Sequence, residues 1–274
     1  PIGRSPLQKA TVKPPPVALL EWFDLHRNAA TRVALPQGLR EVSGLAATAD
    51  QRVFAHGDEF GVVAQIDPAT GNATKRFSLG SPAIRGDFEG IAIVGERFFL
   101  VTSNGRLYET REGANGAGMP FTVLDTGFGK TCEIEGLAWE PADRVLLVGC
   151  KTVLASRRSR TVTIFRWALD QKRPATPDRL TLDLADVPKS TGVTNVRVSS
   201  IEHDPRTGHL LAIAGPAWQL VELTKEGRVV AARGLSRHVH LQPEGMTILG
   251  DSLLLIADEG GRGRASLTRY RRAR

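Results

Sequence analysis

The sequence predicts an all-β fold, a single β-propeller of four-stranded antiparallel blades, and three observations support this. A short motif, best seen in Phe88-Glu89-Gly90-Ile91-Ala92, recurs five times along the 274 residues. The small residue at its centre falls at positions 44, 90, 136, 200 and 245, at intervals of 45 or 46 residues except for one of 64. Each interval holds short apolar runs separated by Gly, Pro, Asp and Asn. Repeats of roughly 40–50 residues built from short strands are typical of propellers.

The first residues of the chain differ in composition from the rest. Residues 1–16 are basic, polar and rich in proline, which predicts a disordered tail ahead of a propeller domain over 17–274. Residues 17–27 fit either a short helix or an extra strand packed on the domain. The chain begins at Pro1 without Met, so we expect that any export signal has already been removed.

From residue 31 onward, apolar runs can be assigned to strands in chain order. Blade one comprises 43–49, 52–59, 62–67 and 73–79; blade two, 90–95, 97–103, 105–111 and 121–126; blade three, 136–141, 144–150, 161–169 and 180–184; blade four, 199–204, 209–215, 218–223 and 228–235; and blade five, 245–250, 252–258 and 266–272. Blade five lacks one strand, which residues 31–36 are expected to supply, closing the ring without open edges. We therefore predict five blades, with six as the alternative if 17–27 or 152–195 add strands.

The residue just before each small motif residue is polar. These five residues are Ser43, Glu89, Glu135, Ser199 and Glu244. Because the innermost strands of a propeller all begin on one face, they are expected to form a ring at one mouth of the central channel. The second strands end on that same face and add ligand-binding candidates, namely Asp58, Glu59, Ser103, Asn104, Lys151, Asp258 and Glu259.

Carboxylates that converge on one axis repel one another unless a cation joins them or their pKa values rise. Oxygen ligands at a channel mouth suit a hard cation, and Ca²⁺ tolerates irregular geometry better than Mg²⁺. We therefore predict that Glu89, Glu135 and Glu244 hold a divalent cation, calcium. The alternative is that each glutamate bonds backbone N–H groups of a neighbouring blade, with Gly90 and Gly136 small because the inner strands crowd the axis.

Three histidines are the candidates for proton transfer, should the site catalyse a reaction: His56, His238 and His240. His238 and His240 project together if the chain there is extended; an exposed loop pair is the alternative. The cysteines Cys132 and Cys150 lie nearly opposite each other if the hairpin between them turns around Ala142. A disulfide is therefore geometrically open to them, and so is a reduced pair. A disulfide would indicate an oxidising compartment, periplasmic or secreted.

The composition limits the classes of partner. The net charge is +7 and the isoelectric point is near 9.8, but most basic residues are scattered, so we do not expect a nucleic-acid-binding protein. No run approaches 18 apolar residues, so we expect no transmembrane segment in this chain. We expect a monomer that binds a small molecule or a peptide.

An ordered set of motifs resembles a known family. EVSGLA, HGDEFG, DFEGIA, SNGRLYE, CEIEGLA, DPRTGHLL, GRVVAARGL, QPEGM and LLLIADEGG, between residues 41 and 270, are similar to the SdiA-regulated (YjiK-like) β-propeller family. The resemblance implies a compact propeller, in proteins that are often exported or tethered to a membrane. It brings no defined reaction and no catalytic residue. The chain departs from the pattern in blade four, where Ser199 and Ser200 replace Glu-Gly.

Three functions are compatible with these patterns. The first is an extracytoplasmic propeller that binds calcium and an unidentified ligand at the channel mouth. The second is a calcium-dependent hydrolase of esters or lactones, by analogy with metal-dependent propeller enzymes of similar architecture. The third is an interaction module without metal.

Overall fold

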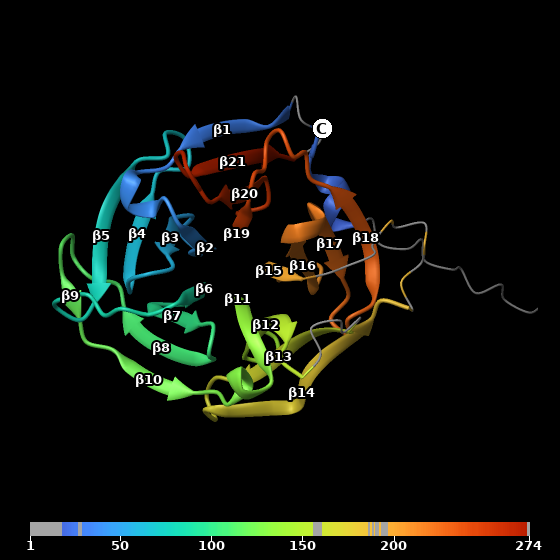
Figure 1. The fold of residues 1–274 in the computed structure, drawn as a ribbon, viewed down its shortest axis with the longest axis horizontal. Helices are drawn as coiled ribbons and strands as arrows, with labels where there is room; N and C mark the ends of the chain where they lie inside the picture. The colour runs from blue at the N-terminus through green and yellow to red at the C-terminus, as the bar shows by residue number, and fades with distance from the viewer. Residues whose placement is uncertain are drawn as a thin grey trace, which may run out of the picture.

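The structure, a computed structural model, describes residues 18–26, 29–155, 161–185, 187, 189, 192 and 197–272. Five sheets stand around a central axis (Figure 1), which confirms the all-β, five-bladed propeller. The tail predicted for residues 1–16 lies outside the described residues. Within the described ranges, no helix has the length and apolar character needed to cross a membrane.

Each blade is a meander whose first strand lies nearest the axis (Figure 1). Blade one contains β2 (Val42–Ala47), β3 (Val53–Gly57), β4 (Val62–Ile66) and β5 (Ala73–Leu79). Blade two contains β6 (Phe88–Val94), β7 (Arg97–Thr102), β8 (Arg106–Arg111) and β10 (Thr122–Asp125). Blade three contains β11 (Cys132–Glu140), β12 (Val145–Val153), β13 (Thr161–Ala168) and β14 (Arg173–Asp183). Blade four contains β15 (Val198–Asp204), β16 (His209–Ala214), β17 (Gln219–Leu223) and β18 (Val229–Gly234). Blade five contains β19 (Pro243–Leu249), β20 (Leu253–Asp258), β21 (Ser266–Arg271) and β1 (Thr31–Ala34).

Strand β1 closes the ring by pairing antiparallel with β21, so the predicted N-terminal closure is confirmed. The six-bladed alternative is wrong. Residues Leu19–Trp22 form a short 3-10 helix, η1, and the described strands within 152–195 belong to blade three. One strand was not expected: β9 (Gly118–Met119), from the loop between β8 and β10, adds a parallel edge to blade one beside β5.

The apolar core is divided into five clusters, each between two neighbouring blades. Both faces of a blade pack against its neighbours, so the inner strands are buried along most of their length. Between blades one and two, Phe54, Phe77 and Phe98 pack edge to face, with the centroids of Phe54 and Phe98 4.9 Å apart. Adjacent blades are therefore joined mainly by side-chain packing.

Helix η1 completes the cluster between blades four and five. Leu19, Leu20 and Phe23 are buried there. The backbone N–H groups of Leu19 and Leu20 donate to the two carboxylate oxygens of the fully buried Glu222, at 2.9 and 3.0 Å. His209 Nδ1 lies 2.5 Å from the same carboxylate. The segment before β1 is thus attached to blade four by a buried, hydrogen-bonded acid.

Every inner strand carries a bulge at the ring position of the repeated motif. In blade one, Val42 pairs with Gly57 and Gly44 with His56, which leaves Ser43 unpaired. The same shift leaves out Glu89 in blade two, Ser199 in blade four and Glu244 in blade five. In blade three it leaves out Glu135 together with the next residue. A bulge turns its extra side chain away from the regular alternation of the strand.

Crowding at the axis requires glycine after the bulges of blades two and three, at Gly90 and Gly136. A Cβ added to Gly90 would lie 2.7 Å from the backbone nitrogen of Leu137 in the next blade. Gly136 has a positive φ of 87°, and a Cβ there would lie 3.1 Å from the backbone nitrogen of Ile201. The packing explanation for these two glycines is therefore confirmed.

Candidate functional site

The five bulged residues lie at the start of the innermost strands, at one end of the channel, which we call the glutamate mouth. Ser43 Oγ donates a hydrogen bond to Glu89 Oε2 at 3.0 Å, linking blades one and two. Ser199 Oγ donates to the carbonyl oxygen of Pro243 at 2.7 Å, linking blades four and five. The two serines of the ring therefore join neighbouring blades. This is the kind of structural role that the alternative hypothesis assigned to the glutamates.

Lys151 lies among the three glutamates. It extends from β12, and its Nζ is 2.6 Å from Glu135 Oε2 and 3.9 Å from Glu133 Oε1. The charges of Glu89 and Glu244 also act on Lys151, and together these acids raise its pKa despite burial. Its ammonium group is therefore held in the charged state at the centre of the mouth.

Glu135 and Glu244 come from blades three and five and interact directly. Glu135 is almost fully buried, and burial together with the charge of Glu244 and a hydrogen bond between the two carboxyls raises its pKa to about 10, although Lys151 opposes the change. Burial and a neighbouring carboxylate both disfavour ionisation, so Glu135 keeps its proton at neutral pH. No N–H or O–H group in the described part of the chain donates to Glu244 Oε2.

Glu89 is also a weaker acid than an exposed glutamate. Burial, followed by the charge of Asp87, raises its pKa to about 8, while Lys151 and Ser43 act in the opposite direction. Asp87 itself accepts a hydrogen bond from Ser103 Oγ. Ser103 therefore acts on the ring through Asp87.

The acidic character extends to the rim of the mouth. Burial raises the pKa of Glu259 to about 7, with further contributions from the charges of Glu244, Asp58 and Glu41. Burial and Glu41 likewise raise the pKa of Asp58. The acids that act on one another across this face are Glu41, Asp58, Glu59, Asp87, Glu89, Glu135, Glu244 and Glu259. The mouth is thus acidic on a chain whose overall charge is +7.

Some predicted ligand-binding residues have other partners. Asp258 is fully buried, where its Oδ2 lies 2.8 Å from His240 Nδ1. His240 Nε2 lies 2.7 Å from Tyr270 Oη, so the three side chains form a sealed network inside blade five. Asn104 is exposed and accepts hydrogen bonds from Thr102 Oγ1 and the Arg106 nitrogen within its own turn.

The histidines are not gathered at the mouth. His56 is fully buried, its Nδ1 lies 2.9 Å from the carbonyl oxygen of Gly57, and burial lowers its pKa to about 4. His238 and His240 neither project together nor form an exposed pair, because the chain turns there, burying His240 and leaving His238 exposed. Of the three, His238 alone is open to solvent.

A cavity of about 260 Å³ opens beside Lys151, Glu135 and Glu244. Its other walls include Trp218, Pro216 and Leu241, a large apolar side chain that is 58% exposed. Trp218 adopts a left-handed backbone conformation with φ of 49°, and its Nε1 donates to the carbonyl oxygen of His240. Sequence reasoning missed this wall. The Gly-Pro pair before Trp218, which permits the turn, was the signal available.

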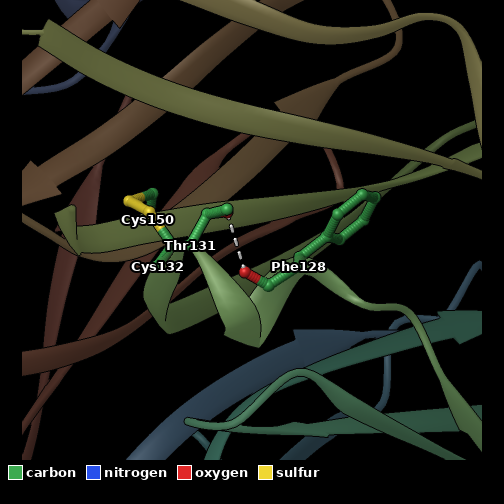
Figure 2. Close-up of a disulfide and its surroundings, with 4 residues drawn as sticks. All are labelled: Phe128, Thr131, Cys132 and Cys150. Carbon is green, nitrogen blue, oxygen red and sulfur yellow. Dashed lines mark hydrogen bonds between the residues drawn. A yellow bond between two sulfur atoms is a disulfide. The ribbon is translucent and has the colours of Figure 1, made fainter. Parts of the chain in front are cut away.

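A disulfide joins Cys132 and Cys150 next to this site (Figure 2). Their Cα atoms are 5.7 Å apart, within the usual range. The hairpin is offset from the predicted register: Cys132 pairs with Val153, and Cys150 with Ile134. Cys150 precedes Lys151 in β12, and Cys132 lies three residues before Glu135 in β11, so the bond ties together the two strand ends that carry this ion pair. The helix η4 (Phe128–Lys130) leads into this end, where Thr131 Oγ1 donates to the Phe128 carbonyl oxygen.

The mouth does not present a ready calcium site. In the described ranges no group of three or more His, Cys, Asp or Glu side chains is arranged to hold a metal ion. Lys151 Nζ lies 2.6 Å from Glu135 Oε2, so a metal ion bound to that oxygen would have to displace the ammonium. Calcium therefore stays a prediction.

The fold and the site define a five-bladed β-propeller with an acidic channel mouth. The sequence model of the SdiA-regulated family matches residues 178–269, about a third of the chain, and confirms the resemblance seen in the motifs. No curated protein sequence matches the chain.

Solved structures show the same fold at low identity. The glutaminyl cyclase of Myxococcus xanthus is 15% identical, with 89% of this chain and 97% of that chain covered and a TM-score of 0.59. A luciferin-regenerating enzyme is 10% identical, with 88% of this chain and 95% of that chain covered and a TM-score of 0.51. A streptogramin B lyase is 10% identical, with 91% of this chain and 99% of that chain covered and a TM-score of 0.50. These similarities concern the propeller fold alone.

Proposed function

We propose that the protein is an extracytoplasmic binding protein whose glutamate mouth takes a cationic ligand. The observation that carries this proposal is the convergence of Glu89, Glu135 and Glu244, from three blades, around the ammonium of Lys151. One ammonium cannot balance three ionised carboxylates, and burial together with repulsion from neighbouring acids raises the pKa values of Glu89 and Glu135, so that both hold protons at neutral pH. A ligand that brings positive charge can take the place of these protons.

A ligand with a protonated amine fits this mouth better than a bare metal ion. Glu244 Oε2 receives no hydrogen bond from a donor in the described residues, so this oxygen is open to the N–H groups of an ammonium. The cavity of about 260 Å³ beside it has room for more than an ion, and Trp218 and Leu241 offer apolar contact. The proposed ligand is therefore a small amine, or a peptide amine, with a compact apolar body.

The disulfide supports the extracytoplasmic part of the proposal, since such bonds persist mainly in oxidising compartments. No observation favours the ester or lactone hydrolase. Two of its three candidate histidines, His56 and His240, are sealed inside the blades. That hypothesis is tested by assaying aryl esters and lactones with and without calcium.

The experiment is a thermal-shift titration with n-butylamine hydrochloride, with n-butanol as the uncharged analogue, and with calcium chloride as a separate arm. The amine is expected to raise the melting temperature in a saturable way, because a ligand at 100 times its Kd stabilises by about 2.7 kcal/mol. Butanol is expected to have no such effect. A shift with calcium alone would restore the calcium prediction.

The variants are Glu244→Gln, which removes the acceptor charge, and Glu226→Gln, a matched change at an exposed glutamate in the turn before β18. Only Glu244→Gln should abolish the amine shift. If neither amine nor calcium stabilises the native protein, or if both variants respond like it, the cation-binding proposal is refuted and the interaction-module hypothesis is favoured.

A further inference from the structure

A second cavity, of about 400 Å³, lies at the opposite end of the central channel, and we call it the distal cavity. All five inner strands contribute to its wall, one residue from each being Ala46, Ile91, Leu137, Glu202 and Thr247. These residues lie towards the carboxyl ends of their strands, whereas the glutamate ring lies at the amino ends. The distal cavity is therefore separate from the glutamate mouth.

Most of the wall is apolar, and two carboxyl groups, those of Glu202 and Asp204, line it. Ile91, Leu137, Trp139 and Ile248 line the cavity together with several alanines. Glu202 lies beside Thr247, and burial raises the pKa of Glu202 to about 8, while Thr247 and the backbone of His203 and Ile248 act in the opposite direction. A carboxylic acid that keeps its proton at neutral pH can donate a hydrogen bond, which an ionised one cannot.

The other polar groups of the cavity leave it close to neutral. His203 is 6% exposed, burial lowers its pKa, and its Nδ1 has no hydrogen-bond partner within the described residues. Asp204 is buried and paired with Arg206 Nε at 2.8 Å, and Thr207 Oγ1 also donates to it. The guanidinium of Arg206 also lies over the ring of Trp22, 4.9 Å from its centroid. The charges near Glu202 are thus compensated before any ligand enters.

From this arrangement we infer that the distal cavity binds a neutral, mainly apolar small molecule that carries a hydrogen-bond acceptor such as a carbonyl. The apolar body packs against Ile91, Leu137 and Ile248, and Glu202 donates to the acceptor. The unpartnered Nδ1 of His203 offers a second polar contact. A charged ligand would have to compete with the Asp204–Arg206 pair and would lose its hydration against the apolar wall.

The test uses prodan, a neutral naphthalene that carries a ketone and whose emission reports the polarity around it. Saturable binding with blue-shifted emission is expected, together with energy transfer from Trp139, which lines the cavity. Trp139→Phe should remove most of the transfer without abolishing binding. Binding without any contribution of Trp139 would place the probe elsewhere and overturn the assignment.

Two variants block the cavity or alter its donor. Ala49→Trp fills the cavity from an exposed wall position, and Ala142→Trp is the matched control, because Ala142 is exposed in the turn after β11 and does not line the cavity. Ala49→Trp is expected to weaken prodan binding at least tenfold, and the control to leave it unchanged. Glu202→Met, which cannot donate, should weaken it about 3- to 10-fold, the worth of one hydrogen bond. Equal affinity in all of these variants would refute the proposal.

The pH dependence of prodan binding distinguishes hydrogen-bond donation by Glu202 from a purely steric role of this side chain. The titratable or charged groups around Glu202 are His203 and Asp204 on its own strand and Arg206 in the turn that follows; β19 contributes Thr247 and the backbone of Ile248. Binding to the native protein should weaken above about pH 8, where Glu202 ionises. Glu202→Gln, whose amide donates at every pH, should bind without that decline. The same decline in Glu202→Gln would show that Glu202 is not the donor.

Discussion

The most informative perturbation of the glutamate mouth is Glu89→Gln, studied as a function of pH. The pKa of Glu89 is raised from 4.5 to about 8, mainly by burial. A group whose pKa is raised by folding contributes stability that is complete below the unfolded value and is lost as pH rises through the folded value. Native Glu89 should therefore cost the protein stability between about pH 4.5 and pH 8.

The size of this loss of stability follows from the same pKa interval. At 1.36 kcal/mol per pH unit, the rise from 4.5 to about 8 corresponds to roughly 5 kcal/mol of unfolding free energy. Glu89 keeps some contact with solvent, so we expect about half of this, roughly 2–3 kcal/mol. The glutamine still accepts the hydrogen bond of Ser43 but does not titrate. The melting temperature of Glu89→Gln relative to the native protein should therefore rise by roughly 4–6 °C between pH 5 and pH 8.5.

The assay is thermal unfolding by circular dichroism at those two pH values. The matched control is Glu96→Gln, in the turn between β6 and β7 of the same blade, where the side chain of Glu96 is 85% exposed. The difference in melting temperature between Glu96→Gln and the native protein should be the same at both pH values. If Glu89→Gln behaves like this control, the carboxyl of Glu89 is not buried among other acids and the electrostatic account of the mouth is wrong.

Three further changes test the scaffold. Reduction of the Cys132–Cys150 bond should lower stability by about 2–4 kcal/mol, measured as a lower melting temperature with reductant; no change would mean that the bond does not constrain the β11–β12 hairpin. Glu222→Ala should release helix η1, at a cost of about 1–3 kcal/mol per group left unpaired, seen as faster hydrogen exchange at Leu19 and Leu20; unchanged exchange would contradict the attachment. Gly90→Ala should destabilise by about 1–3 kcal/mol because its Cβ would meet the Leu137 nitrogen, whereas Gly234→Ala, with no atom within 4 Å, should not; equal effects would exclude crowding at the axis.

The fold was predictable because its information is local and repeated. The spacing of the motif predicted the number of blades. Because blade five lacked one strand, residues 31–36 were predicted to close the ring, and β1 forms there. The role of residues 17–27 was not predictable. It depends on Glu222, about 200 residues away, which accepts hydrogen bonds from Leu19 and Leu20.

The site was only partly predictable, for physical reasons. Strand order placed Glu89, Glu135 and Glu244 on one face, but the ion pair of Glu135 with Lys151 depends on the bulge in blade three, which no period-two pattern reveals. Asp258 was assigned to the mouth from its place at a strand end. Its side chain instead turns inward to His240, a partner 18 residues away that the pattern could not indicate.

The central claim is that the glutamate mouth binds a cation, and a crystal structure of the protein with saturating n-butylamine tests it most directly. The account predicts the amine nitrogen within about 2.7–3.2 Å of a Glu244 oxygen, with the alkyl chain towards Trp218 and Leu241. In a crystal with calcium instead, an ion about 2.3–2.6 Å from several of these carboxylates would identify the metal as the cation. A mouth that holds only water under both conditions would contradict the claim.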